Sequence, residues 1–310
     1  MATAQTQLFP GHDGGDWAQV PSKIVATWPA GTFAENLAAL PDGAILVSLH
    51  SHKRIDRYDP ASGKVTTFLE LPAPAAGLSF DASGYLWVTG GALGAAPGYV
   101  WRVDRSAAVQ PWVEIPDAYF MNGCTSVAGG TLLVCESATG RVLAVDQSAK
   151  KWRVWLADQR LAPSDPQMPG ANGIKVFGGH AYISVTDSNT LYRVKLAGAE
   201  AAGSLEVVAE NLRADDFAFA ASGALYIATH PAQSVVRLTP QGRRTTIAGP
   251  KEGLVGSTAC AFGKAAADAK ALYVTTTGGV YFPYEGVLQE AKLVRLEVGE
   301  TAAPLLDGAN

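Results

Sequence analysis

The segment Ala82-Ser83-Gly84-Tyr85-Leu86-Trp87-Val88 combines a glycine turn with a strand of alternating large apolar residues. Variants of it recur roughly every 45 residues, and a period of this length with several short strands per unit is typical of a β-propeller. The sequence therefore predicts an all-β fold, a six-bladed β-propeller of four-stranded antiparallel blades. The other copies occupy residues 41–47, 129–134, 179–185 and 222–227, and a sixth at 270–274 lacks the glycine but keeps the strand.

The repeats account for nearly all of the 310 residues. We therefore expect residues 23–310 to form a single six-bladed propeller domain, preceded by an N-terminal arm at residues 1–22. Lys23–Trp28 has strand character and is expected to pair with the strands near Lys292–Val298, which would close the ring and remove an exposed edge. The sequence does not indicate an oligomeric state.

The composition narrows the function classes. Apolar residues make up 48% of the chain and charged residues 17%, which suits buried strands. The net charge of −4 and the absence of Lys/Arg runs argue against a nucleic-acid partner. No apolar stretch is long enough to cross a bilayer, and no signal peptide is visible in Met1–Trp17, so we expect a cytoplasmic protein without a membrane partner. The cysteines, which lack metal-binding or redox spacing, are Cys124, Cys135 and Cys260.

Equivalent positions of the aligned repeats, which we call the repeat register, predict where a site lies. Eight positions before the turn glycine, the first strand of a blade begins at one mouth of the central channel. In blade four His180 takes the turn position, and blade six is aligned by matching Ala261-Phe262 to Ala218-Phe219. Five of these six equivalent positions are polar, and oxygen-rich side chains without His or Cys suit a hard cation such as Ca²⁺. A water-bridged polar ring is the alternative. In blade order the positions hold Glu35, Ala76, Asn122, Asn172, Asp215 and Thr258.

Seven positions after the turn, the second strands end at the same mouth. Histidine and carboxylate side chains there are consistent with substrate binding or proton transfer. For each of them alone, an exposed loop residue is the alternative interpretation. These positions hold His50, Gly91, Ser137, Asp187, His230 and Thr277.

With these residues in place, the chain resembles the SMP-30/gluconolactonase/luciferin-regenerating-enzyme family of six-bladed propellers, from about Thr32 to Val298. The resemblance implies one divalent ion, Ca²⁺ in preference to Zn²⁺, Mn²⁺ or Mg²⁺. Its ligands would be Glu35, Asn172 and Asp215, with Asn122 binding metal or substrate. The family's Pro-Asp-Gly segment is replaced here by Ala214-Asp215-Asp216, so either aspartate could be the ligand; the register favours Asp215.

The function implied by the resemblance is metal-assisted hydrolysis of a lactone or related ester, a small-molecule substrate. Asp215, Asp187 or His230 would deprotonate the attacking water. Where some sugar lactonases place an arginine, this chain has Phe120, which favours a less polar substrate. No Gly-x-Ser-x-Gly elbow is present, so a serine esterase is not expected. The residues expected to contact substrate are Asn122, Phe120, Met121, His50, Asp216 and Thr258.

Two other functions stay open at this point. The first is a non-hydrolytic propeller enzyme, of isomerase, cyclase or condensing type, that acts on a natural-product-like substrate. The second is a propeller that binds a ligand without catalysis, because a fold alone does not determine function.

Overall fold

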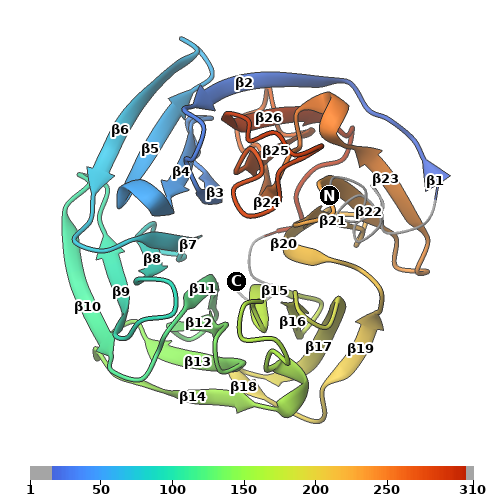
Figure 1. Cartoon of the computed structure of the whole chain (residues 1–310). Coiled ribbons are helices and arrows are strands. Elements are labelled where there is room, and N and C mark those ends of the chain that lie inside the picture. Colours follow the sequence, from blue (N-terminus) through green and yellow to red (C-terminus); the bar gives the residue numbers. More distant parts are fainter. Residues whose placement is uncertain (1–15, 305–310) are drawn as a thin grey trace. The chain divides into compact units, whose positions relative to one another are not determined.

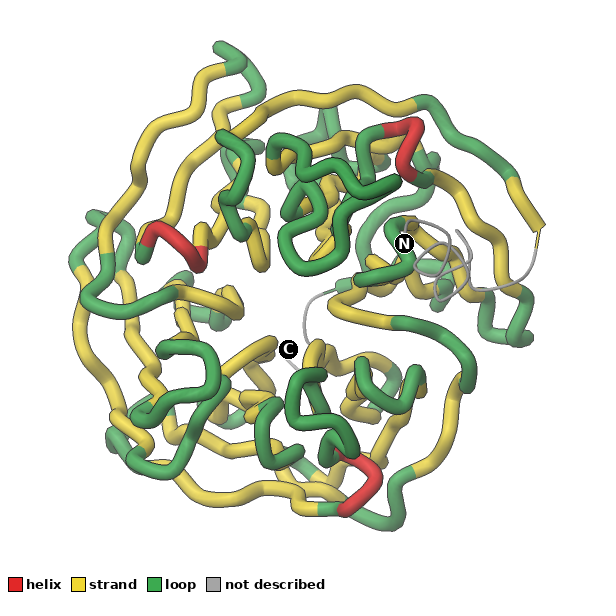
Figure 2. Tube along the Cα trace, viewed as in Figure 1, coloured by secondary structure: helices red, strands yellow, loops and turns green. Residues whose placement is uncertain are grey.

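The computed structural model describes residues 16–304, and strands dominate this part of the chain (Figure 1). Figure 2 shows the helical turns as short interruptions between strands; they are the 3-10 helices η1 (His50–His52), η2 (Gln159–Leu161) and η3 (Pro250–Glu252). The strands form six sheets of four or five strands. The protein is thus a six-bladed β-propeller, as the repeat predicted.

By their contacts the residues divide into two compact units. Unit 1 holds the described residues up to Glu70 together with Asp215–Ala303, and carries three blades. Blade one consists of β3 (Ala34–Ala39), β4 (Ile45–Leu49), β5 (Arg54–Asp59) and β6 (Lys64–Glu70). Blade five consists of β20 (Ala214–Phe219), β21 (Leu225–Thr229), β22 (Ser234–Leu238) and β23 (Arg244–Ala248), and blade six of β24 (Ser257–Phe262), β25 (Ala271–Thr276), β26 (Ala291–Glu297) and β2 (Ser22–Trp28).

Unit 2 holds Leu71–Ala214 and carries the other three blades. Blade two consists of β7 (Ala75–Phe80), β8 (Leu86–Gly90), β9 (Gly98–Val103) and β10 (Val109–Ile115). Blade three consists of β11 (Met121–Val127), β12 (Thr131–Glu136), β13 (Arg141–Asp146) and β14 (Trp152–Ala157). Blade four consists of β15 (Ala171–Phe177), β16 (His180–Val185), β17 (Thr190–Ala197), β18 (Glu200–Ala201) and β19 (Glu206–Ala209). The prediction that the whole forms one domain stays a prediction.

The N-terminal segment completes two blades of unit 1. β2 pairs antiparallel with β26, which confirms the pairing expected for Lys23–Trp28. The predicted arm, residues 1–22, lies partly outside the described residues. Its described part includes β1 (Asp16–Trp17), which pairs parallel with β23 and so adds a fifth strand to blade five.

The glycine turn and the alternating strand of the repeat account for the turn geometry and the buried side chains of the blades. Gly43, Gly84 and Gly223 have φ values of 89°, 84° and 82°, a left-handed conformation that glycine adopts without strain. The alternating side chains that follow pack between neighbouring sheets. In unit 1, Leu37, Val47 and Tyr273 belong to one buried cluster, while Leu133, Ile174 and Ile183 belong to another in unit 2.

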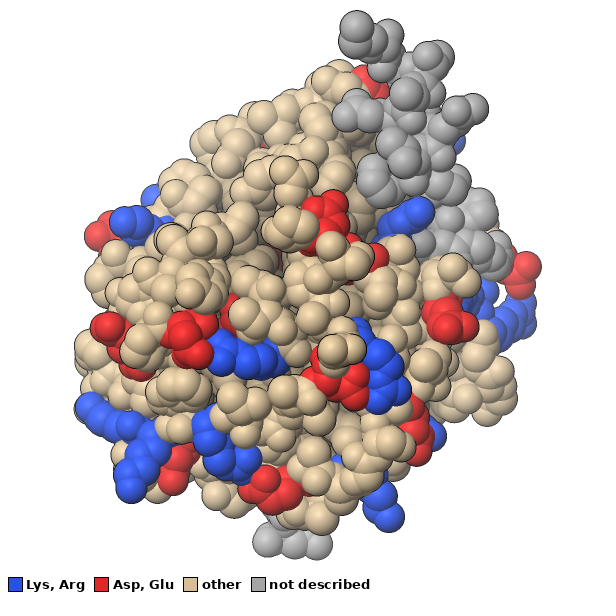
Figure 3. Space-filling view, turned by 60° about the horizontal axis from the view of Figure 1, so that its bottom comes forward, with Lys and Arg blue, Asp and Glu red and all other residues tan. Residues whose placement is uncertain are grey.

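The surface carries charges of both signs. Figure 3 shows acidic and basic side chains interspersed over the face in view, not gathered by sign. Many form ion pairs, such as Arg141 with Asp117 and Arg193 with Glu206. Within residues 16–304, no helix has the length and apolar character needed to cross a membrane.

Candidate functional site

The structure confirms the repeat register at the starts of the inner strands. In all six blades the residue picked out by the register is the second residue of its first strand, and each is buried. A local shift of strand pairing falls next to this position in blades one, two, three, four and six. Such β-bulges commonly re-aim a side chain at a functional site. The six residues are Glu35, Ala76, Asn122, Asn172, Asp215 and Thr258.

Hydroxyl side chains on the second strands support these bulges. The amide N of Asn36 donates to Ser48 Oγ (2.9 Å), that of Gly77 to Thr89 Oγ1 (3.0 Å) and that of Gly173 to Ser184 Oγ (2.8 Å). Each hydroxyl thus satisfies an amide that the shifted pairing would leave without a strand partner. The sequence signal was a Ser or Thr within an otherwise apolar strand, and our sequence analysis did not use it.

In unit 1, Glu35 is a carboxyl group in a dry, negatively charged environment. It is 4% exposed, and burial together with the charge of Asp216 raises the pKa of Glu35 to about 8. Asp216 is held in place on both oxygens: Asn36 Nδ2 donates to Oδ2 (2.9 Å) and the amide N of Phe217 to Oδ1 (2.8 Å). The role of Asn36 was not foreseen from the sequence.

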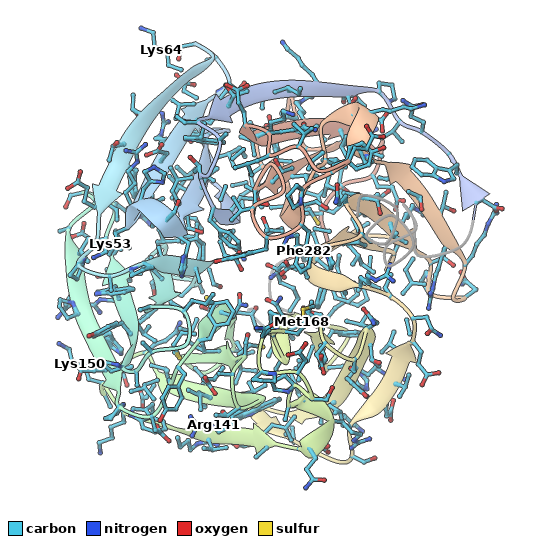
Figure 4. All side chains as sticks on the ribbon, in the orientation of Figure 1. Lys53, Lys64, Arg141, Lys150, Met168 and Phe282 are labelled. Carbon is cyan, nitrogen blue, oxygen red and sulfur yellow. The ribbon has the colours of Figure 1, made fainter. Side chains whose placement is uncertain are left out.

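Asp215 and His230 form a second buried pair in unit 1. Nδ1 of His230 lies 3.6 Å from Oδ2 of Asp215. Burial lowers the pKa of His230 to about 4, so its imidazole is neutral at pH 7. Its Nε2 is buried and has no hydrogen-bond partner within residues 16–304. The ring of Phe282, labelled in Figure 4 on the loop between β25 and β26, meets the imidazole edge-on at 5.5 Å.

In unit 2, Asn122 and Asn172 are amides whose orientation is fixed by their neighbours. Ser137 Oγ donates its proton to the carbonyl of Ala171 (2.6 Å) and therefore accepts from Asn122 Nδ2 (3.2 Å). Thr186 Oγ1 likewise donates to the carbonyl of Ala214 (3.3 Å) and accepts from Asn172 Nδ2 (2.9 Å). Because a hydroxyl has one proton to give, each amide keeps its oxygen as the end available to a ligand.

The other register residues have visible structural partners. Thr258 Oγ1 donates to the carbonyl of Ala34 (2.8 Å), next to Glu35. His50 lies at the start of η1 against the ring of Phe33 (5.8 Å). In unit 2, Asp187 accepts two hydrogen bonds from Ser164, at 2.7 and 2.8 Å, and so holds the loop before β15.

Met121 and Phe120, the two apolar residues of unit 2 that were predicted to contact substrate, differ in burial. Met121 is 1% exposed and packs in the blade core, where its side chain would collide with any side chain at Gly98. This packing accounts for Met121 without a substrate. Phe120 is half-buried, and its amide N is held by Glu136 Oε1 at 3.1 Å.

The oxygen atoms of the buried carboxyl and amide side chains are suitable ligands for a divalent cation. Carboxylate and amide oxygens are the ligands that Ca²⁺ prefers, and a cation would offset the cost of ionising Glu35 beside Asp216. Of the residues that the structure describes, no three His, Cys, Asp or Glu side chains group as a metal site by themselves. Amide oxygens are therefore needed to complete one. That Glu35, Asp215, Asn122 and Asn172 share an ion stays a prediction.

The six-bladed propeller fold has counterparts among solved structures. No family model matches the chain. The structure of regucalcin, a calcium-binding protein from Agrobacterium tumefaciens, superposes with a TM-score of 0.71 at 18% identity, over 94% of this chain and 98% of that one. A gluconolactonase from Xanthomonas campestris gives 0.66 at 14% identity, over 90% of each chain. These matches confirm the predicted resemblance in fold.

A relative found by sequence is described as an enzyme of another reaction type than the structural neighbours. A Phoma sp protein described as a "Putative hetero-Diels-Alderase" is 24% identical over 312 residues, which cover 84% of this chain and 88% of that protein.

Proposed function

We propose that this protein is a metal-dependent hydrolase that opens a lactone or a related ester of a small molecule. The observation that carries the proposal is the set of buried acidic groups of unit 1, where Glu35, Asp215 and Asp216 are each less than 5% exposed beside a neutral imidazole. Buried carboxylates are costly unless something compensates them, and they gather at functional sites for that reason. The similarity in fold to gluconolactonase and regucalcin supports the same function.

Glu35 and Asp215 are the proposed charged ligands of the ion, and the amide oxygens of Asn122 and Asn172 are its proposed neutral ligands. The repeat register favours Asp215 over Asp216 as the ligand, and Asp216 accepts hydrogen bonds on both oxygens from Asn36 and Phe217. When bound, a divalent ion supplies Lewis acidity to the substrate carbonyl.

His230 is the proposed proton acceptor. At pH 7 it is neutral, and its buried Nε2 can accept a proton from the attacking water. Asp215, 3.6 Å from Nδ1, orients the ring and stabilises the imidazolium that forms. The proton then passes to the departing alkoxide of the opened ring. Asp215 and Asp187 were the other predicted bases; Asp215 is assigned here to the ion and the imidazole, and Asp187 already accepts two hydrogen bonds from Ser164, which supports His230 as the base.

A panel of lactones tests this proposal. Protein dialysed separately against Ca²⁺, Zn²⁺, Mn²⁺ and Mg²⁺ is assayed for acid release, with chelated protein as the control. We expect catalysed ring opening of at least one lactone, loss of it on chelation, and recovery when the ion is returned. Absence of turnover with every ion would contradict the proposal.

The second candidate is a non-hydrolytic enzyme that closes or rearranges a ring. The observation in its favour is the 24% identity to the "Putative hetero-Diels-Alderase", which extends over most of both chains. In that case the buried acidic groups would orient a substrate by hydrogen bonds, and Glu35, with its raised pKa, would donate as a neutral acid. The test is the conversion of a diene–enone pair by chelated protein. Conversion that persists after chelation and releases no acid would favour this candidate.

A further inference from the structure

The loop between β25 and β26 is unlike its counterparts in unit 1. It runs over the 14 residues between Thr276 and Ala291, whereas four residues join β21 to β22. Three of the large apolar side chains exposed in the described chain lie on it: Tyr281 (63%), Val287 (58%) and Leu288 (45%). Like His50 and His230, this loop follows the second strand of its blade.

The loop is fixed at its base. The amide N of Gly278 donates to the carbonyl of Val255 (3.0 Å), and that of Gln289 donates to the carbonyl of Gly278 (2.8 Å). Tyr281 has a φ of 74°, a conformation that is costly for a residue with a side chain. Such strain is found most often at functional sites. The fold thus holds an aromatic ring in solvent at a cost, without burying it.

Two adjacent aromatic residues connect this loop to the candidate site. Phe282 meets the His230 imidazole at 5.5 Å, and its carbonyl accepts from Gln233 Nε2 at 3.2 Å. Tyr281 meets Phe33 at 5.7 Å, two residues before Glu35. Both contacts lie within unit 1. The aromatic pair therefore lies beside the proposed base on one side and beside the strand that carries Glu35 on the other.

The loop carries mainly apolar side chains. Residues 278–290 contain no Lys, Arg, His or Asn, and their only charges are Glu285 and Glu290. A polyhydroxylated ligand requires several converging hydrogen-bonding side chains, whereas this loop exposes the large apolar side chains of Tyr281, Val287 and Leu288. The rings of Tyr281 and Phe282 can instead take a further flat ring in stacked or edge-to-face contact.

We propose that Tyr281 and Phe282 form an aromatic wall of the substrate site, and that the substrate carries an aromatic or other flat apolar ring next to the reacting bond. This inference rests on the proposed function for the reacting group, a lactone or ester. It narrows the substrate class from lactones in general to aryl-substituted lactones, and it excludes sugar lactones as preferred substrates.

A binding measurement tests the wall without requiring turnover. The probe is 5-phenylpyrrolidin-2-one, a hydrolysis-resistant lactam analogue of γ-phenyl-γ-butyrolactone, with glucono-lactam as the polar comparison; both are titrated into Ca²⁺-dialysed protein by calorimetry. We expect the phenyl lactam to bind at least tenfold tighter than glucono-lactam. Tyr281→Ala and Phe282→Ala should each weaken it about tenfold, in line with the contribution of an aromatic pair.

Two matched variants serve as controls. Tyr281→Phe keeps the ring and should bind within about twofold of wild type. Val207→Ala truncates another exposed apolar side chain (52%), on β19 of unit 2, and should change nothing. Because Tyr281 is exposed, its alanine variant is expected to fold, which keeps the test valid if Phe282→Ala does not.

The outcomes separate this inference from the proposed function. Equal or tighter binding of glucono-lactam, or unchanged binding in Tyr281→Ala, would overturn the aromatic wall even if lactones are hydrolysed. Tight phenyl-lactam binding that Tyr281→Ala weakens would support the wall. Should no lactone then be hydrolysed with any ion, the hydrolase would be contradicted and the wall would stand.

Discussion

Equivalent positions of one repeat carry different chemistry in the two units. In unit 1 the second residues of the inner strands include the carboxyl groups of Glu35 and Asp215, whereas in unit 2 they are Ala76 and the amides of Asn122 and Asn172. The amides are satisfied by Ser137 and Thr186, while Glu35 is left with burial and a neighbouring negative charge. The blade fixes the position of these side chains, and their surroundings determine whether they are satisfied or reactive.

The largest expected effect comes from neutralising the carboxyl groups of unit 1. Glu35→Gln and Asp215→Asn should each lower kcat/KM by at least about a hundredfold, because an interaction that stabilises the transition state is lost. Rates on the best lactone of the panel measure this. Asp42→Asn, which alters an exposed carboxylate paired with Arg57, should leave the rate unchanged. If kcat/KM fell by less than tenfold in both Glu35→Gln and Asp215→Asn, the carboxyl groups of unit 1 would not have the catalytic role that sets them apart from the amides of unit 2.

His230→Gln should lower kcat by about a hundredfold with little change in KM, since a proton acceptor acts mainly in the transition state. Steady-state kinetics separate the two parameters. His180→Gln is the matched control, because His180 begins β16 in unit 2, where its Nδ1 lies 2.9 Å from the carbonyl oxygen of Gly178 in the preceding turn. A rise in KM at constant kcat would assign His230 to substrate binding instead.

The pH dependence of stability should distinguish the unsatisfied acid from the satisfied amides. In the folded protein Glu35 holds its proton up to about pH 8, whereas in the unfolded chain it loses it near 4.5. The folded state therefore binds more protons in this interval, and its stability falls as pH rises. His230, with a lowered pKa, acts in the opposite direction but only below about 6.5.

Between pH 6.5 and 8, chelated protein should thus lose about 2 kcal/mol of unfolding free energy. Urea denaturation at several pH values measures the slope. Added Ca²⁺ should flatten it by favouring the ionised carboxylate, and Glu35→Gln should flatten it without the ion. A slope that persists in Glu35→Gln would show that another group is responsible.

The smallest effect is expected from unit 2. Asn172→Ala removes an amide oxygen that the repeat register assigns to the ion, and Thr186→Val removes the hydroxyl that orients this amide. Each should weaken Ca²⁺ affinity by about tenfold, the lower end of what such supporting groups contribute. Calorimetric titration measures the affinity. Ser164→Ala, which removes one of the two hydrogen bonds that Asp187 accepts in the same unit, is the control and should have no effect.

Much of the geometry was predictable because a repeat sets positions independently of side-chain contacts. The aligned repeats located Glu35, Asn172 and Asp215 at the same step of their strands, even though the turn position of blade four holds His180 and not glycine. Contacts between blades could not be predicted in this way. The bond from Asn36 to Asp216 joins residues 180 apart, and no local pattern encodes it. The Tyr281–Phe282 loop was also missed, because it is an addition to blade six that departs from the repeat.

Metal content tests the central claim, that the buried carboxyl groups of unit 1 hold a divalent ion, most directly. Wild type, Glu35→Gln, Asp215→Asn and the control Asp42→Asn are dialysed against Ca²⁺ and Zn²⁺ and analysed by elemental mass spectrometry. We predict one equivalent of ion in wild type and in Asp42→Asn, and none in the two site variants. Wild type without metal, or site variants that keep a full equivalent, would contradict the account.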